Sequence, residues 1–269
     1  MKRIRLVALD LDGTLISNTL RVSSAVASAI ARAREAGVTF TMATGRMFAA
    51  AKPFAGAVGI DGPIVCYQGA ATYDVSTGVR LSHVPLPIDV GERVFSLANA
   101  DGVRALGYFD DALYAEVDDD YTESYKKLAR VEAHVVGPLT EFFRTRPSTK
   151  INCVLDVEKA AAYVERLRAE LGNAAYVTRS QPDFVEVLNA SVDKGRALAA
   201  IAEYYRISLD ETMAIGDSWN DVPLLASAGL GVAMGTAPPE LRAKADAVVG
   251  GVEQDGVAEA LERFVLSAA

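Results

Sequence analysis

The segment Asp10–Leu15, with the sequence DLDGTL, places two carboxylates two residues apart directly after an apolar run. Side chains two residues apart on an extended chain point the same way, so Asp10 and Asp12 are expected to emerge together where a strand ends. Carboxylates this close repel each other unless a divalent cation holds them. One can then act as a nucleophile and the other as a proton donor and acceptor. The alternative is an ordinary polar turn, since Asp and Gly are common turn residues.

Three further segments carry polar side chains where predicted strands end or a predicted helix begins. Thr44–Arg46 (TGR) follows an apolar strand, and a hydroxyl with free N–H groups before a helix suits a phosphate oxygen. Lys194 opens a helix, a position where the helix dipole favours anions, so an anionic partner is expected nearby. Gly216–Asp221 (GDSWND) supplies oxygen-bearing side chains that suit a hard cation. A turn, a solvated lysine and a helix N-cap are the respective alternatives.

In this order and spacing, the four segments resemble the motifs of the haloacid dehalogenase-like superfamily. The stretch between the second and third segments resembles the inserted cap of the Cof-type branch (type IIB cap). GVAMG at 231–235 and DGVAEAL at 255–261 are also similar to that branch. The resemblance covers essentially the whole chain. It implies a Mg²⁺-dependent phosphatase that hydrolyses small phosphate monoesters, sugar phosphates by analogy, through an aspartyl-phosphate.

The resemblance also implies roles for individual residues. Asp10 attacks phosphorus, and Asp12 protonates the leaving oxygen and later activates water. Mg²⁺ is held by the Asp10 carboxylate, the Asp12 main-chain carbonyl and Asp217, while Asp221 supports the metal or the lysine of the third segment. The groups implied to hold the phosphoryl oxygens belong to Leu11, Thr44, Gly45, Lys194 and Asn220.

The chain departs from the branch's pattern after the third predicted strand, where Gln68 and Gly69 stand in place of an Asn-Gly pair. Specificity therefore cannot be carried over closely from the branch. Gln68 and Arg46 are candidates for contacting the substrate. Further candidates in the inserted module are Tyr108, Asp110 and Lys150.

The alternation of apolar runs predicts an α/β protein with a parallel sheet and crossover helices. We predict a doubly wound, Rossmann-like sheet formed by residues 1–83 and 187–269. The intervening residues, 84–186, are predicted to form an inserted α+β cap domain that closes over the substrate. The prediction rests on strands at 5–10, 38–43, 63–67, 211–217 and 229–234, on helices at 24–36, 47–58 and 194–205, and on a hairpin at 71–83.

The composition restricts the classes of partner. The 269 residues carry a formal net charge of -8, and an acidic chain repels a polyanion, so nucleic-acid binding is disfavoured. Cys66 and Cys153 lie in apolar runs outside any CxxC pair and are predicted to be buried free thiols. No segment looks long and apolar enough to span a membrane, and Asp10 and Asp12 interrupt the first apolar stretch too early for a signal peptide. We expect a cytoplasmic monomer or homodimer that acts on a small phosphorylated metabolite.

Two other interpretations stay open at this point. A phosphomutase or phosphotransferase of the same superfamily would pass the aspartyl-phosphate to a second substrate rather than to water. A non-catalytic relative would bind a phosphate ligand without turnover. Mg²⁺ binding without phosphate release would favour the second of these.

Overall fold

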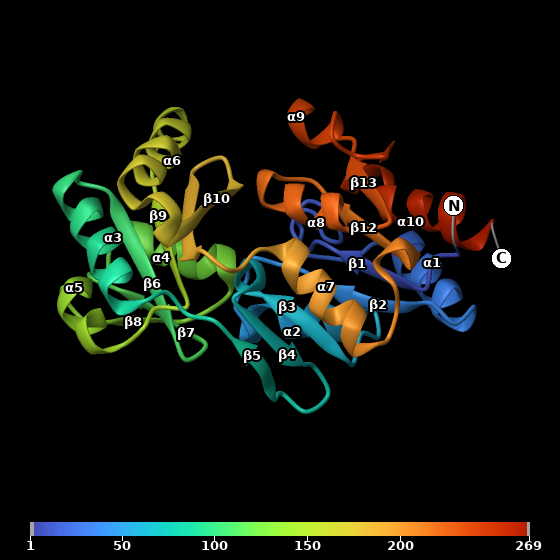
Figure 1. Cartoon of the computed structure of the whole chain (residues 1–269), viewed down its shortest axis with the longest axis horizontal. Coiled ribbons are helices and arrows are strands. Elements are labelled where there is room, and N and C mark those ends of the chain that lie inside the picture. The colour runs from blue at the N-terminus through green and yellow to red at the C-terminus, as the bar shows by residue number, and fades with distance from the viewer. Residues whose placement is uncertain (1–2, 268–269) are drawn as a thin grey trace. The chain divides into compact units, whose positions relative to one another are not determined.

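The computed structural model describes residues 3–267, apart from the side chains of Leu128 and Ala129. Within this range the chain divides into two compact units (Figure 1). The sequence-based boundaries at 83/84 and 186/187 differ slightly from this division, and residues 45–50 group with the second unit rather than the first. The first unit comprises Met1–Thr44, Ala51–Leu81 and Asp193–Ala269, and the second comprises Gly45–Ala50 and Ser82–Val192.

The first unit is built on a parallel sheet in the order β14-β13-β12-β1-β2. β1 (Leu6–Leu9) is a run of buried apolar residues, as expected for a strand covered on both faces. It pairs in parallel with β12 (Thr212–Gly216) on one side and β2 (Thr39–Met42) on the other. β13 (Leu230–Met234) and β14 (Ala247–Val249) continue beyond β12. The strand order therefore reverses at β1, and such a switch point is where open α/β sheets bind ligands.

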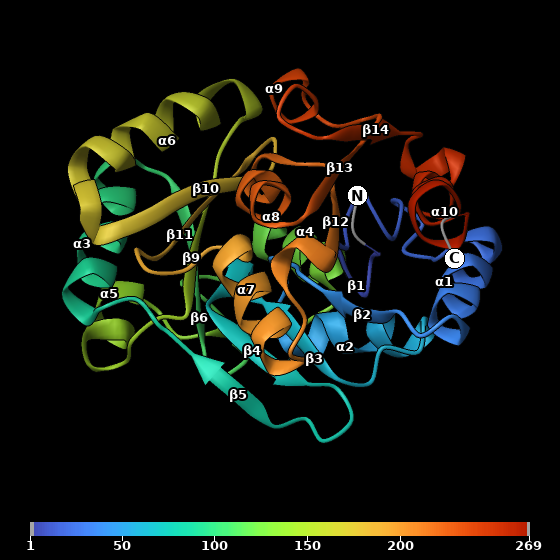
Figure 2. The same ribbon diagram turned by 45° about the vertical axis from the view of Figure 1, so that its right-hand side comes forward.

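Helices cover both faces of this sheet (Figure 2). In chain order they are α1 (Ser24–Glu35), α2 (Phe48–Ala57), α7 (Lys194–Tyr204), α8 (Val222–Ser227), α9 (Pro239–Arg242) and α10 (Gly256–Leu261). Ala233 of β13 shares a core cluster with α7 and α8, whereas its neighbour Met234 lies against Gly256 of α10. Successive strand residues point to opposite faces, so α7 and α10 lie on opposite sides, and α1 packs against α10. The predicted doubly wound α/β core is confirmed.

The predicted third strand pairs differently from expectation. β3 (Pro63–Cys66) meets the parallel sheet through an isolated bridge between Ala43 and Val65. Its ladder instead runs antiparallel to β4 (Ala71–Asp74), and β5 (Arg80–His83) completes this small sheet. Besides this ladder, the Val65 carbonyl accepts from the Thr44 N–H at 3.0 Å and the Pro63 carbonyl accepts from the Thr41 hydroxyl at 2.9 Å. The hairpin predicted after the third strand is confirmed.

The second unit contains a sheet in the order β10-β11-β9-β6-β7-β8, in which β7 and β8 are parallel and the other pairs are antiparallel. Its strands are β6 (Arg104–Phe109), β7 (Ala112–Ala115), β8 (Ala133–Val135), β9 (Lys150–Val154), β10 (Ala175–Gln181) and β11 (Phe184–Asn189). Its helices are α3 (Ile88–Ala100), α4 (Asp120–Ala129), α5 (Leu139–Phe142) and α6 (Val157–Leu171). This arrangement agrees with the α+β fold predicted for the insertion.

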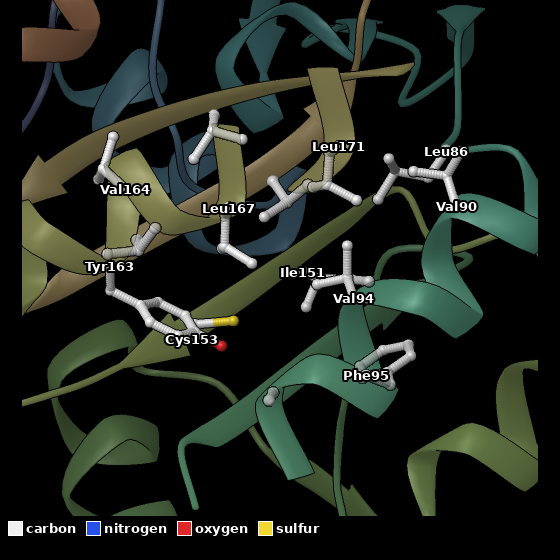
Figure 3. Close-up of a cluster of buried hydrophobic side chains, with 14 of the residues drawn as sticks. Leu86, Val90, Val94, Phe95, Ile151, Cys153, Tyr163, Val164, Leu167 and Leu171 are labelled. Carbon is white, nitrogen blue, oxygen red and sulfur yellow. The ribbon is translucent and has the colours of Figure 1, made fainter. Parts of the chain in front are cut away.

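An apolar core joins α3 and α6 to one face of this sheet (Figure 3). Phe95 of α3 and Leu167 of α6 belong to the same buried cluster as Ile151 and Cys153 of β9. Cys153, like Cys66 in β3, is a buried free thiol, as predicted. The second unit therefore has a hydrophobic core of its own, which is a defining property of a domain.

Candidate active site

Asp10 and Asp217 follow neighbouring strands of the parallel sheet. Leu9 at the end of β1 is paired with Ile215 of β12, so the residues that come next leave the same edge of the sheet. Carboxylate oxygens of Asp10, Asp217 and Asp221 lie within 4.8 Å of one another. Asp10 and Asp221 are buried and Asp217 is half-buried. We call these three side chains the acidic cluster; it brings together the first and fourth sequence segments.

Leu11 and Asp12 lie in a tight turn that follows β1. The Leu11 carbonyl accepts hydrogen bonds from the N–H groups of Leu15 and Ile16, both at 2.9 Å, and the Gly13 N–H donates to the Ile16 carbonyl at 2.9 Å. Asp12 is half-buried in this turn. Among the described residues, its carboxylate is not a member of the acidic cluster. The Asp12 carboxylate is therefore not one of the three that lie within 4.8 Å of one another, although Asp12 follows Asp10 closely in the same turn.

Gly13 and Thr14 show how this turn accommodates Asp217. Thr14 Oγ1 donates a hydrogen bond to Asp217 Oδ1 at 3.0 Å. Gly13 has a φ of +85°, and a Cβ atom built on it would lie 2.3 Å from Asp217 Oδ2. Only glycine adopts this conformation readily while leaving room for the carboxylate. Sequence reasoning did not single out Thr14, although its place in the DxDGT segment was a usable signal.

Lys194 supplies positive charge to the acidic cluster. It is the first residue of α7, its side chain is fully buried, and it donates to Asp10 Oδ1 at 2.5 Å and to Asp221 Oδ1 at 2.7 Å. Asp193 caps the helix by accepting a hydrogen bond from the Arg196 N–H at 2.8 Å. The cap fixes the first turn of α7, and this in turn fixes the position from which Lys194 reaches the cluster.

Asp221 is held by fixed donors on both of its oxygens. Oδ1 accepts from Lys194, and Oδ2 accepts from the backbone N–H groups of Asp217 and Ser218, both at 3.0 Å. The side chain is completely buried. These bonds occupy most of the acceptor capacity of the carboxylate. The geometry therefore favours a supporting role for Asp221 over direct contact with a ligand.

Burial and mutual repulsion raise the pKa values of the acidic cluster. Burial first, and then the charge of Asp221, raise the pKa of Asp10 well above its usual range despite the opposing effect of Lys194. Burial and Asp221 likewise raise the pKa of Asp217 to about 7, against the lowering effect of the hydrogen bond from Thr14. Burial on its own lowers the pKa of Lys194, but the neighbouring carboxylates outweigh it and the net pKa is raised.

The acidic cluster fits a hard divalent cation. Its three carboxylates, when ionised, outnumber the ammonium group of Lys194. The raised pKa values of Asp10 and Asp217 have the same cause, a local excess of buried negative charge. Carboxylate oxygens are the ligands that Mg²⁺ prefers in proteins. A cation at this position would favour the ionised form of both aspartates.

Thr44 and Asn220 are joined by the turn that carries Gln68. The Thr44 carbonyl accepts a hydrogen bond from the Gln68 N–H at 3.0 Å. Asn220 Nδ2 donates to Gln68 Oε1, also at 3.0 Å. All three residues are buried. The structure thus links the second and fourth sequence segments through Gln68, a residue for which the sequence suggested substrate contact and not this bridging position.

Gly45, Arg46 and Lys150 belong to the second unit. Lys150 is buried on β9, where its Nζ donates to the Gly45 carbonyl at 2.8 Å and to Glu186 Oε1 at 2.5 Å. The same Nζ lies 4.9 Å from the centre of the Tyr108 ring. Arg46 is half-buried. Thr44 and Gly45, adjacent in the second sequence segment, therefore fall on either side of the division between the units.

Comparison with known proteins places the chain in a family. The family model of haloacid dehalogenase-like hydrolases matches residues 7–261. The chain belongs to this family. The haloacid dehalogenase-like hydrolase described here is 29% identical over 264 residues to the pyridoxal phosphate phosphatase YbhA of Escherichia coli strain K12, covering 95% of this chain and 96% of the relative. It is 30% identical over 251 residues to the HMP-PP phosphatase of Enterobacter sp. strain 638, and the match covers 89% of this chain and 87% of that relative.

The fold of this haloacid dehalogenase-like hydrolase is shared with solved structures. A sugar phosphatase of subclass IIB, 21% identical, matches with a TM-score of 0.86 over 97% of this chain and 98% of that one. The predicted family, fold class and phosphoric monoester hydrolase activity are confirmed at the level of the family and its named phosphatases. No helix within residues 3–267 combines the length and apolar character needed to cross a membrane.

Proposed function

We propose that this chain is a Mg²⁺-dependent phosphatase that uses Asp10 as its nucleophile on small phosphate monoesters. The observation that carries the proposal is the acidic cluster together with Lys194, whose ammonium group donates a hydrogen bond directly to Asp10. A buried carboxylate kept beside a fixed ammonium group is preorganised for attack on an anion. Membership of the hydrolase family supports the same chemistry.

Asp10 and Asp217, together with the main chain of Asp12, are the residues that would hold Mg²⁺. The bound ion would neutralise negative charge on the carboxylates and on the phosphoryl group. The oxygen donors of the acidic cluster and the raised pKa values of Asp10 and Asp217 support this assignment.

The proposed reaction has two displacements at phosphorus. An ionised oxygen of Asp10 bonds to phosphorus while the bond to the leaving oxygen breaks, and Asp12 donates a proton to that oxygen. Water then attacks the aspartyl-phosphate and gives a proton to Asp12. The bond between Asp10 and phosphorus breaks in this second step, which releases inorganic phosphate and returns both side chains to their starting states.

The remaining groups of the site orient the phosphoryl oxygens and balance their charge. Lys194 favours the ionised form of Asp10 against the opposing effects of burial and Asp221, and it lies where charge on the transferred group has to be neutralised. The hydroxyl of Thr44, the amide of Asn220 and the backbone near Leu11 and Gly45 are proposed to bind the phosphoryl oxygens. Phosphoryl transfer depends mainly on such positioning and charge neutralisation.

The substrate is proposed to be a small phosphorylated metabolite. The relatives are named as phosphatases of pyridoxal phosphate and HMP-PP, and the subclass IIB structure is that of a sugar phosphatase. The net charge of -8 opposes binding of a polyanion. The buried free thiols of Cys66 and Cys153 support the cytoplasmic location expected from the sequence.

The test is phosphate release from a panel of sugar phosphates, pyridoxal phosphate, nucleotides and a chromogenic aryl phosphate. Each is assayed with Mg²⁺ and with a chelator, for the wild type, Asp10→Asn and the control Asp61→Asn, whose side chain is exposed. We expect Mg²⁺-dependent release that falls roughly 10³-fold or more in Asp10→Asn and is unchanged in the control. The proposal would be contradicted if phosphate release were the same with the chelator as with Mg²⁺, or if Asp10→Asn still released phosphate at the wild-type rate.

A further inference from the structure

The turn Tyr67–Gly69 has an unusual backbone for its sequence. Tyr67 has a φ of +51°, Gln68 +57° and Gly69 +109°. Glycine adopts positive φ readily, but two side-chain-bearing residues in succession do so only where surrounding contacts hold them. Such strained turns concentrate at functional sites, so the contacts that hold this one are informative.

The turn contacts three segments that carry proposed phosphate-binding groups. The N–H of Gln68 donates to the carbonyl of Thr44 at 3.0 Å, and its Oε1 accepts from Asn220 Nδ2 at 3.0 Å. Gly69 lies directly against the backbone of Asp193, because a Cβ atom at Gly69 would be 2.5 Å from the Asp193 carbonyl oxygen. Asp193 is the residue before Lys194. The strained turn therefore fixes the relative positions of these segments.

The amide of Asn220 is oriented by Gln68. The side chain is buried, and its Nδ2 donates to Gln68 Oε1. Its Oδ1 is buried without a hydrogen-bond partner among the described residues. A buried acceptor left unpaired is unfavourable, so this orientation requires a contact that selects it. The bond to Gln68 is such a contact.

We propose that Gln68 is a positioning residue of the phosphate site, which acts by fixing the amide of Asn220. The second N–H of Nδ2 stays available to a phosphoryl oxygen. This inference rests on the proposed function, since it assumes that Asn220 belongs to a phosphate site.

A double-mutant cycle tests whether Gln68 acts through Asn220. Gln68→Met keeps the length of the side chain and removes the acceptor, Asn220→Ala removes its partner, and both are combined in a third variant. The readouts are kcat and KM for phosphate release, the inhibition constant of inorganic phosphate, and Tm. We expect Gln68→Met to weaken phosphate inhibition and kcat/KM roughly tenfold in the wild-type background and to have almost no effect in the Asn220→Ala background.

Gln254→Met is the matched control. The side chain of Gln254 accepts a hydrogen bond from the Gly251 N–H at 2.9 Å in an exposed turn of the same unit. Its loss is expected to lower Tm without changing phosphate inhibition. If Gln68→Met does not fold, Gln68→Asn replaces it, because Asn tolerates a positive φ but is one methylene too short to keep the bond.

The outcomes separate this inference from the proposed function. The role of Gln68 would be overturned if the two substitutions lowered kcat/KM independently, so that their effects multiplied in the double variant. It would also be overturned if Gln68→Met lowered Tm and left phosphate inhibition unchanged. Either result would leave the phosphatase activity itself unchallenged. Absence of Mg²⁺-dependent release by the wild type would overturn the proposed function itself, and the inference with it.

Discussion

Asp10 and Asp217 have raised pKa values because burial and the charge of Asp221 disfavour their ionised forms. Between about pH 4 and pH 7, the folded protein therefore keeps a proton on Asp217 that the unfolded chain has already released. The stability that this provides is fully present below about pH 4 and is lost as the pH rises through about 7. A bound divalent cation opposes this effect, since it favours the ionised carboxylates.

Mg²⁺ is accordingly expected to stabilise the protein more at pH 8 than at pH 6. At pH 6 the cation has to displace protons from the acidic cluster, and this weakens binding. Saturating Mg²⁺ should raise Tm by about 3 °C or more at pH 8 and by less at pH 6. Differential scanning calorimetry measures both shifts, and Asp217→Asn should reduce them. Equal shifts at the two pH values would mean that the cation does not bind at these carboxylates.

The sequence could predict which charged residues lie together at one edge of the sheet, but not how each is held. Asp10, Lys194 and Asp217 were identifiable because carboxylates and a lysine stand where strands end or a helix begins. The bond from Thr14 to Asp217 joins residues far apart in the sequence and depends on the positive φ of Gly13. The bond between Gln68 and Asn220 depends on a strained turn in the same way. Tertiary geometry of this kind leaves no periodic pattern in the sequence.

At the level of helices and strands, the contact between α7 and α8 determines where Lys194 lies. Gly195 is the second residue of α7, and a Cβ atom on it would lie 2.3 Å from the Pro223 carbonyl oxygen and 2.4 Å from Ser227 Oγ. Because the first of these atoms is backbone, α7 would have to move away from α8 to make room. Lys194 and Gly195, adjacent in the sequence, therefore combine a charged group with the close helix contact that positions it.

Gly195→Ala is expected to destabilise the protein by about 1–3 kcal/mol and to lower kcat for phosphate release, although alanine is the better helix former. Gly56→Ala is the matched control, since Gly56 also lies in a helix and nothing stands within 4 Å of an added Cβ atom. It should leave activity unchanged and stabilise the protein by roughly 0.5 kcal/mol. Denaturant unfolding and steady-state assays measure both. If the two variants behave alike, the contact between α7 and α8 does not position Lys194.

Short strands were the elements that the sequence did not reveal. β8 (Ala133–Val135) and β14 (Ala247–Val249) were not predicted, because three residues are too few to show an alternating or continuous apolar pattern. Both occupy an edge of their sheet. The longer buried strands β1 and β12 were predicted within a residue or two, since their apolar runs are bounded by polar segments.

At the level of the whole molecule, the changed pattern of helices and strands between residues 84 and 186 predicts that the chain is divided there. The grouping of 45–50 with the second unit was not predicted, because it depends on contacts made only after folding. Asp111, in the turn between β6 and β7, accepts hydrogen bonds from the N–H groups of Phe48 at 2.9 Å and Ala49 at 3.0 Å. Lys150 donates to the Gly45 carbonyl. Neither pairing has a local sequence signal.

Residues 82–192 are expected to fold as an isolated fragment. The segment contains the whole second sheet, its helices and its apolar core. Its two ends are tied together, since Asn189 Nδ2 donates to the Pro85 carbonyl at 2.8 Å, and the N-terminal end is also held by the Leu86 N–H, which donates to the Ser148 carbonyl at 2.8 Å. An inserted domain with adjacent ends can fold without the sequence that flanks it. Cooperative thermal unfolding and a dispersed amide NMR spectrum would demonstrate this.

The fragment should be less stable than the same unit in the full chain but should not be unfolded. It lacks the Gly45 carbonyl, so Lys150 loses one acceptor and keeps Glu186, a change worth about 1–3 kcal/mol. Leu167→Asp is the control, because Leu167 is fully buried in the core and a carboxylate there should abolish the cooperative transition. A fragment without a cooperative transition would show that the second unit needs residues 45–50 or the first unit to fold, since its own core would then be insufficient.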